Sequence, residues 1–418
     1  MFVQKSSARN TVCKTKGRKM NNLFGMFIHW GIYSVAGLHE QAFAKYDFDR
    51  KQYEGMKDVF EPVKYDPEQW VLLAKNAGMK YICFTTKHHD GFCMWDTKYT
   101  DYNIMNTPYG KDVLKMLADA CQKHGVKLSL YYSNPDWHHV NAYNSKSSHQ
   151  WKAVDKASAD FKKYREYVIN QVTELLTNYG KIYTFFWDIM PQIEDRSINE
   201  LVRKLQPGIL INNRGYDEGD FSTPERGEGD RLEFRHFEKM TEACNAVGFN
   251  SWGYRKNEDY HSVRNLTYSV MKIMALGGSY LLNVGPHPDG TIGDREKKII
   301  ERVGKWYLST EGCLENAEAD DFDYGLKEHA CIINKKNGKT YFHFTQGLSY
   351  DAVYIERFPS IPKKVRLLNT KEELPFEMRV IPSYYDRDSG ICTGEYLTIS
   401  NIPVDDLENE PITIEVEW

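Results

Sequence analysis

Long hydrophobic runs are missing from this sequence. No stretch of its 418 residues approaches the roughly 20 consecutive apolar residues of a membrane-spanning helix, so we expect no membrane insertion. Residues 1–7 also lack the apolar core of a signal peptide. This predicts a cytoplasmic protein if the chain is unprocessed. A secreted or periplasmic location is compatible with a mature fragment, so the compartment stays unassigned.

Paired cysteines and a strong net charge are missing as well. The eight cysteines are scattered, and no two form a Cys-x-x-Cys motif, which argues against a zinc knuckle or a redox site. Cys83 and Cys121 lie among apolar residues, which predicts buried free thiols. The formal net charge is only −4, so neither nucleic acid nor an anionic membrane surface is indicated as a partner.

Aromatic side chains, by contrast, are abundant. Phe, Trp and Tyr make up 14% of the residues, and flat apolar rings with polar edges suit a sugar-binding cleft. The remaining composition, with 41% hydrophobic and 27% charged residues, is that of an ordinary globular protein. The length of the chain favours two domains, each with a core of its own.

A helix, a glycine and a short apolar strand follow one another repeatedly through the first 285 residues. In the clearest copy Asp66 caps a helix that ends at Gly78, and a strand follows at residues 81–86. Further strands are expected at residues 24–28, 128–132, 182–187, 209–211 and 280–282. The alternation predicts an α/β protein with a parallel sheet. Because no nucleotide-binding glycine fingerprint accompanies it, we expect a (β/α)8-like, TIM-type barrel, with its chemistry at the carboxyl ends of the strands.

After the helix at residues 295–309 the pattern changes to short β-rich segments. They are expected at residues 330–333, 341–344, 353–355, 365–368, 396–399 and 412–416. Asn337-Gly338 between the first two is a type I′ hairpin signal. Closely spaced turns predict an antiparallel β-sandwich. We therefore divide the chain into a catalytic barrel domain, residues 1–315, and a C-terminal β-sandwich domain, residues 316–418.

Several strand-end motifs resemble those of one enzyme family. They are FGMFIHWG at residues 24–31, TTKHHDGF at 85–92, LYYS at 130–133, SWGY at 251–254 and GGSYLLNVGP at 277–286. In this order they are similar to family 29 of the glycoside hydrolases, the α-L-fucosidases. The resemblance implies an exo-acting enzyme that hydrolyses terminal α-L-fucosyl linkages by double displacement, through a covalent fucosyl-enzyme intermediate. It implies a carbohydrate partner, a fucosylated glycan or oligosaccharide, and neither a cofactor nor a metal ion.

Two carboxyl groups carry that chemistry, one attacking the sugar and one acting as acid and then base. By the resemblance, Asp188 matches the nucleophile, although a carboxylate after a strand can also cap a helix. Glu225, in Ser-Thr-Pro-Glu, matches the acid/base of several family members. Glu242 matches a second glutamate and stays open as the alternative. Glu228 and Asp230, in the same loop as Glu225, match no motif and are expected to be solvated.

Other polar and aromatic residues match sugar contacts of the family. The residues expected to bind substrate are His29, Glu40, Gln41, His88, His89, Tyr131, Trp187, Arg214 and Trp252. Imidazole rings can donate and accept hydrogen bonds at fixed angles, as recognition of sugar hydroxyls requires. The sequence departs from the family pattern twice. Gln41 stands where many members have Trp, and Phe186 holds the usual place of a Trp, so that Trp187 adjoins Asp188.

Two other protein classes fit parts of the pattern. A metal-dependent amidohydrolase needs His-x-His on its first strand, whereas His29 is followed by Trp30 and Gly31. Adjacent His88 and His89 would also point to opposite faces of a strand and chelate poorly. A lectin would keep the rings without needing the carboxylates. A substrate that shares the hydroxyl pattern of fucose, such as a galactoside, stays open, as does a homo-oligomeric state.

Overall fold

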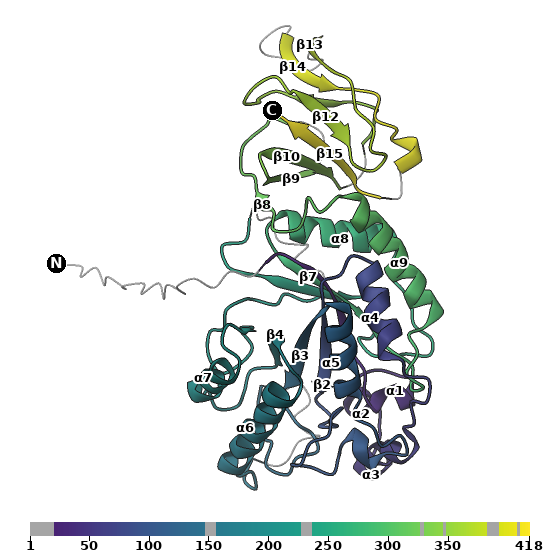
Figure 1. Ribbon diagram of the computed structural model, residues 1–418, viewed down its shortest axis with the longest axis vertical. Helices are drawn as coiled ribbons and strands as arrows, with labels where there is room; N and C mark the ends of the chain where they lie inside the picture. Colours follow the sequence, from purple (N-terminus) through teal and green to yellow (C-terminus); the bar gives the residue numbers. More distant parts are fainter. Residues whose placement is uncertain are drawn as a thin grey trace, which may run out of the picture.

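The structure, a computed structural model, describes residues 21–146, 156–226, 236–326, 330–345, 348–382, 393–407 and 410–418. A parallel sheet surrounded by helices forms one part of it, and antiparallel sheets form the other (Figure 1). Helices α8 (Val263–Ala275) and α9 (Asp294–Ser309) lie next to the antiparallel part. None of the helices in the described ranges is long and apolar enough to cross a membrane.

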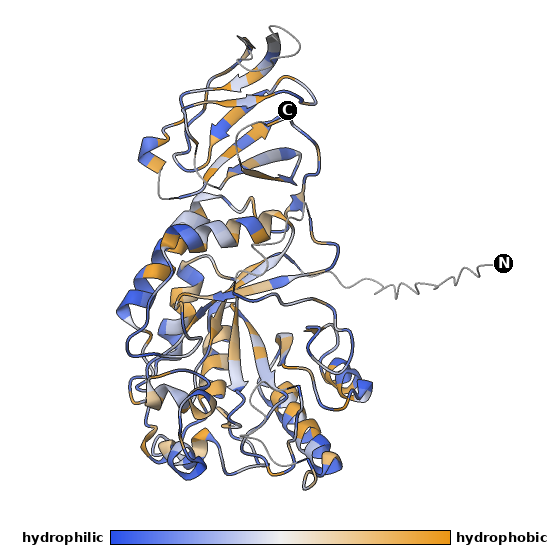
Figure 2. Ribbon diagram, turned by 180° about the vertical axis from the view of Figure 1, so that it is seen from behind, coloured by the Kyte–Doolittle hydropathy of each residue, from blue (hydrophilic) through white to orange (hydrophobic). Residues whose placement is uncertain are grey.

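Seven parallel strands form the larger sheet, in the order β5-β4-β3-β2-β1-β7-β6. They are β1 (Phe24–Ile28), β2 (Tyr81–Lys87), β3 (Lys127–Ser133), β4 (Ile182–Asp188), β5 (Leu210–Ile211), β6 (Glu242–Ala246) and β7 (Ser279–Val284). Six of them were expected from the sequence. Strand β6 was not, because its residues Glu-Ala-Cys-Asn-Ala have little intrinsic preference for a strand. The central strands are largely hydrophobic, as a sheet covered on both faces requires (Figure 2).

Capping side chains mark the start of several of the helices, as the sequence predicts. The Asp66 carboxylate accepts hydrogen bonds from the amides of Glu68 and Gln69, and Gly78 ends the segment with a positive φ of 81°. The helices of this part are α4 (Pro67–Asn76), α5 (Val113–His124), α6 (Phe161–Asn178), α7 (Arg196–Leu205), α8 and α9, with the short α1 (Tyr33–Ala36), α2 (Ala42–Lys45) and α3 (Arg50–Glu54) after β1. The predicted alternation of helices and strands is therefore confirmed.

An irregular segment, residues 220–226, links the two edges of the curled sheet. On one side the Asp220 amide donates to Ile211 O (2.6 Å), next to β5. On the other side the amides of Glu242 and Cys244 in β6 donate to residues 222 and 224 at 2.8 and 3.0 Å. The link consists of isolated bridges instead of a regular strand, so the described sheet has seven strands where the sequence predicted eight.

The interior of the curled sheet holds its own apolar cluster. It comprises Leu23, Phe27, Tyr81, Cys83, Tyr131, Phe186, Cys244 and Leu281. Apart from Leu23, which precedes β1, these side chains come from six strands and pack against one another, which only the concave face of a curled sheet allows. The opposite face packs on the helices in a larger core. Side chains that alternate along a strand therefore belong to different environments, and this decides which of them reach the site described below.

Beyond α9 the chain forms two antiparallel sheets, β12-β15-β10-β9-β8 and β11-β14-β13. Their strands are β8 (Glu318–Ala319), β9 (Cys331–Lys336), β10 (Lys339–Phe344), β11 (Val353–Ile355), β12 (Lys364–Leu367), β13 (Phe376–Pro382), β14 (Thr393–Ile399) and β15 (Ile412–Glu417). Asn337 and Gly338 both have positive φ (51° and 77°), which confirms the predicted hairpin turn. One hydrophobic cluster joins the two sheets. The division near residue 315 stays a prediction.

Candidate active site

A cavity of about 110 Å³ lies at the carboxyl ends of β1 to β4. It is bordered by Phe27, His29, Glu40, Gln41, His88, His89, Tyr131, Phe186, Asp188, Ile189, Arg214, Glu225, Cys244 and Trp252. Every site residue expected from the sequence is among them, except Trp187 and Glu242. Three larger hollows, of about 540, 590 and 570 Å³, lie elsewhere; the first two hold none of these residues, and the third shares only Arg214 with the cavity.

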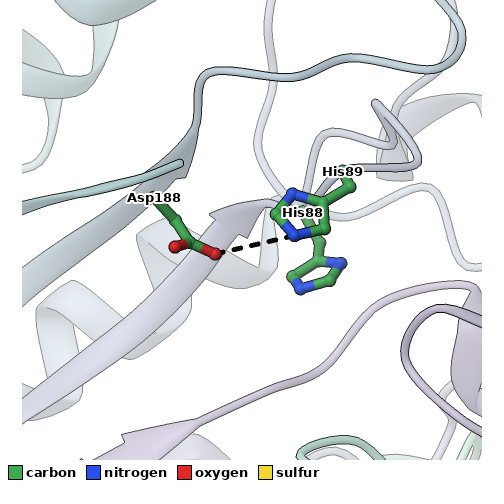
Figure 3. A group of neighbouring side chains, drawn as sticks. All are labelled: His88, His89 and Asp188. Atoms are coloured by element: carbon green, nitrogen blue, oxygen red, sulfur yellow. Dashed lines mark ion pairs between the residues drawn. The ribbon is translucent and has the colours of Figure 1, made fainter. Parts of the chain in front are cut away.

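Asp188 ends β4 and is held by three short hydrogen bonds. Tyr131 Oη donates to Oδ2 at 2.7 Å, while Arg214 Nη1 and the Ile189 amide donate to Oδ1 at 2.9 Å each. His89 Nε2 lies 3.6 Å from Oδ2 (Figure 3). Burial alone would raise the pKa of Asp188, but the charges of His89 and Arg214 and these hydrogen bonds lower it. These contacts therefore favour the ionised form of the carboxylate.

The backbone next to Asp188 is strained. Ile189 adopts a φ of 56°, in the left-handed region that a β-branched side chain rarely enters. Its amide donates to the carboxylate of the preceding residue, a contact that the strained conformation makes available. Such strain costs on the order of 1–3 kcal/mol and persists where the surroundings fix it. Here it helps to fix the direction in which Asp188 faces the cavity.

Glu225 comes from the linking segment and meets Asp188 through a shared partner. Arg214 Nη1 bonds both Asp188 Oδ1 and Glu225 Oε1, and Arg214 Nη2 donates to Thr223 O at 2.7 Å. Two oxygens bonded to one nitrogen lie at most roughly 6 Å apart, twice an ordinary hydrogen bond. The two carboxylates therefore face each other across the cavity at short range. Glu228 and Asp230 lie outside the described residues.

Glu242, the alternative acid/base residue, lies elsewhere. It begins β6, is fully buried and accepts a hydrogen bond of 2.6 Å from Tyr81 Oη. Tyr81 likewise begins β2, so the pair lies at the amino ends of the strands, opposite the cavity. Burial raises the pKa of Glu242 to about 7. A raised pKa suits a general acid, but Glu242, the alternative to Glu225, does not border the cavity.

His88 and His89 face the same cavity, which corrects the expectation that they diverge. Strand β2 ends at Lys87, after an irregularity in its register, so the two histidines lie in a turn. Strand alternation no longer applies there, and their ring centroids are 4.2 Å apart. His89 Nδ1 bonds Ser133 Oγ at 2.7 Å, which leaves Nε2 directed at Asp188.

His29 completes a set of buried imidazoles. Its Nδ1 bonds Asn283 Oδ1 at 2.6 Å, so Nδ1 carries the proton and Nε2 can accept one. Burial lowers the pKa of His29 to about 4 and takes the pKa of His88 well below its usual range. Neutral imidazoles, able both to donate and to accept, are therefore presented to a ligand at neutral pH.

Glu40 is cradled by the residues around Trp252. Its Oε2 accepts from Ser251 Oγ (2.7 Å), the Trp252 amide (2.9 Å) and the Gly253 amide (3.3 Å). Burial would raise the pKa of Glu40, yet His39, the Ser251 hydrogen bond and His29 together lower it. The Trp252 indole stacks on the His29 ring at a centroid distance of 5.2 Å. An ionised carboxylate and an aromatic face therefore lie together on this side of the cavity.

Trp187 does not reach the cavity. Its side chain is fully buried, donates to Asn199 Oδ1 at 2.9 Å and packs edge-on against Tyr216. Because Asp188 and Phe186 point inward, the residue between them must point outward, toward α7. The expectation that Trp187 contacts a sugar is corrected accordingly.

Four cavity residues were missed by the sequence reasoning: Phe27, Phe186, Ile189 and Cys244. Two of them carried a usable signal. Phe27 precedes His29 by two residues, and Phe186 precedes Asp188 by two, so each shares a strand face with a predicted site residue. Ile189 and Cys244 had no such signal, since the first follows a strand and the second lies on the unpredicted β6.

Comparisons with known proteins agree with this geometry. The family described as Alpha-L-fucosidase matches residues 4–312. The plasma alpha-L-fucosidases of Pongo abelii and Homo sapiens are each 28% identical, over 68% of this chain and over 66% and 65% of their own lengths. The chain thus spans just under two thirds of these curated relatives.

Solved structures match over more of the chain. Alpha-L-fucosidase isoenzyme 1 from Paenibacillus thiaminolyticus has a TM-score of 0.80 and 31% identity, covering 94% of this chain and 96% of its own. An alpha-L-fucosidase of family GH29 from Bacteroides thetaiotaomicron, a trapped covalent intermediate with 2-fluoro-fucosyl fluoride, has a TM-score of 0.75 and 25% identity, covering 94% of each chain.

Proposed function

Since the chain belongs to the α-L-fucosidase family, we propose that it is an exo-acting, retaining α-L-fucosidase that hydrolyses terminal α-L-fucosyl linkages of glycans. The covalent intermediate trapped in the Bacteroides thetaiotaomicron relative supports a double displacement in this chain too. The small cavity supports attack on a terminal sugar, because about 110 Å³ has room for little more than one ring.

The observation that carries this proposal is the guanidinium shared by Asp188 and Glu225. Retaining glycosidases keep their two carboxyl groups about 5–5.5 Å apart, whereas inverting enzymes need about 6.5–9.5 Å to admit a water molecule. Two carboxylates that both bond Arg214 Nη1 fit the shorter spacing. Asp188 attacks the anomeric carbon as Glu225 protonates the leaving oxygen. Glu225 then removes a proton from the water that releases fucose and frees Asp188.

The walls of the cavity suit a deoxy sugar. Neutral His29 and His88, together with His89 and ionised Glu40, offer donors and acceptors for ring hydroxyls. Phe27, Phe186 and Trp252 supply apolar surface for the methyl group at C5. Gln41 borders the cavity where many family members have Trp, and we assign it a polar contact in place of stacking.

Azide rescue tests both carboxylates with one aryl α-L-fucoside. Asp188→Gly should lose about 10⁴-fold or more in kcat. Azide should then attack from the vacated side and give the β-fucosyl azide. Glu225→Ala still forms the covalent intermediate, so azide should restore turnover and give the α-fucosyl azide. Glu242→Ala is the matched control and should need no azide. Near-normal turnover by Asp188→Gly would overturn the proposal, as would a β product from Glu225→Ala.

We also propose a two-domain architecture for the whole chain. The seven strands and the linking segment 220–226 support a (β/α)8-like barrel as the catalytic domain, residues 1–315. Residues 316–418 form a β-sandwich domain that buttresses it. Two contacts across the division support this role: Asn334 Nδ2 donates to Cys313 O (3.2 Å), and Arg366 Nη2 pairs with Glu311 (2.7 Å).

A further inference from the structure

His88, His89 and Asp188 place three potential metal ligands together (Figure 3). One ligand atom from each lies within 4.8 Å of the others, and His89 Nε2 and Asp188 Oδ2 are 3.6 Å apart. Zinc binds nitrogen and oxygen at about 2.0–2.2 Å, so neighbouring ligands in a tetrahedral site are about 3.4 Å apart. The first pair is already close to that spacing. The third ligand has to approach the other two by at most about 1.4 Å, the difference between 4.8 and 3.4 Å.

The donors are also prepared for a metal. His88 is almost fully buried, yet its Nδ1 has no hydrogen-bond partner in the described part of the chain. Such an unmet polar atom in a closed cavity is costly, and a ligand relieves the cost. His89 Nδ1 donates a hydrogen bond to Ser133 Oγ, whose own proton goes to Pro135 O, and this fixes the ring with Nε2 toward Asp188, the arrangement that orients histidine ligands in metal sites.

The charge of the cavity favours a cation. Three carboxylates border it, those of Glu40, Asp188 and Glu225. The cations nearest to them are Arg214, which bonds Asp188 and Glu225, and Arg226, whose guanidinium lies 4.6 Å over the Trp252 ring. With His89 neutral, as a metal ligand must be, the carboxylates outnumber the guanidinium groups by one, and a divalent ion would offset the excess.

From these contacts we infer that the cavity binds one zinc ion through His88, His89 and Asp188, and that this ion inhibits the enzyme. A bound ion occupies the carboxylate that has to attack the sugar, so metal and substrate exclude each other. Two imidazoles and a carboxylate select ions in the order Cu²⁺ > Zn²⁺ > Co²⁺ > Mn²⁺, and Mg²⁺, which prefers oxygen ligands, should have no effect. The inhibition rests on the proposed function, whereas the binding does not.

Zinc titration of the EDTA-treated, dialysed full-length chain tests the site directly. Isothermal titration calorimetry should detect one Zn²⁺ per chain, and saturating L-fucose should weaken its apparent affinity at least tenfold by competition. His89→Ala and His88→Ala should each weaken binding at least tenfold. Circular dichroism confirms that both variants fold. The control is His124→Gln, because His124 and Glu68 form a partly exposed pair, 2.9 Å apart, that could bind zinc adventitiously.

The outcomes separate the inference from the proposed function. Zinc bound as tightly by both histidine variants, or zinc lost in His124→Gln, would overturn the cavity site. Loss of fucosidase activity on EDTA treatment alone would also overturn it, because the metal would then be a cofactor and not an inhibitor. Active enzyme without stoichiometric zinc refutes this inference only. Zinc binding by a chain that cleaves no α-L-fucoside refutes the proposed function only.

Discussion

Removing the hydroxyl of Tyr131 isolates one of the contacts that keep Asp188 ionised. In Tyr131→Phe, Asp188 Oδ2 loses its 2.7 Å hydrogen bond and keeps only His89 Nε2, at 3.6 Å. A hydrogen bond to a charged group contributes about 1.5–3 kcal/mol, and one pKa unit corresponds to about 1.36 kcal/mol. The pKa of Asp188 should therefore rise by about one to two units. In the proposed mechanism the ionised form attacks, so as the pH falls the variant should lose activity at a higher pH than the parent enzyme does.

The assay is the pH profile of kcat/KM with an aryl α-L-fucoside. We expect the acidic limb of Tyr131→Phe to move upward by about one to two pH units, with a smaller change on the alkaline limb. Tyr132→Phe is the matched control, because this neighbour loses the same atom but its hydroxyl donates to Gln171, away from the cavity. An unmoved acidic limb in Tyr131→Phe, or an equal movement in Tyr132→Phe, refutes the reasoning.

Two further predictions concern residues that the structure removes from the cavity. Because burial raises the pKa of Glu242 from 4.5 to about 7, the folded state binds its proton more tightly, and stability is lost as the pH rises through that interval. At pH 8, Glu242→Gln should have a higher Tm than the parent, and its free energy of unfolding should be greater by up to about 3 kcal/mol. At pH 4 the two proteins should have the same Tm, and the variant should keep fucosidase activity. An equal Tm at both pH values contradicts this prediction. Trp187→Phe loses the hydrogen bond to Asn199 and some buried surface, so urea denaturation should show a free energy of unfolding that is lower by about 2–3 kcal/mol. The KM should stay within about twofold of the parent value. A tenfold rise in KM would mean that Trp187 touches substrate.

The helices and strands that local signals specify were predictable. Asp66 and Gly78 delimit a helix by short-range hydrogen bonds and backbone conformation, and neither depends on distant parts of the chain. The link at residues 220–226 is different. Its backbone groups bond β5 on one side and β6 on the other, and no periodic pattern marks such an irregular connection. Strand β6 itself is held by its neighbours instead of by residue preference.

The directions of individual side chains were partly predictable. An inward Asp188 requires an outward Trp187, which the period of two already implies. The pair His88 and His89 could not be oriented in this way, because the outcome depends on the residue at which β2 stops. Its register with β3 shifts between Thr85 and Lys87, and that shift arises from contacts between strands. The resemblance to a family supplied the identities of the site residues, while the strand ends supplied their orientation.

Glu225 and Glu242 show why position has to be weighed before acidity. Glu242 has the raised pKa that a general acid needs, and a search for perturbed carboxyl groups would select it. It lies two residues before Cys244, which borders the cavity, and is therefore about 7 Å deeper along the same strand. A proton held there is too far from the cavity to reach the leaving oxygen in the proposed mechanism. Glu225 borders the cavity and shares a guanidinium nitrogen with Asp188, so its position fits the proposed acid/base role.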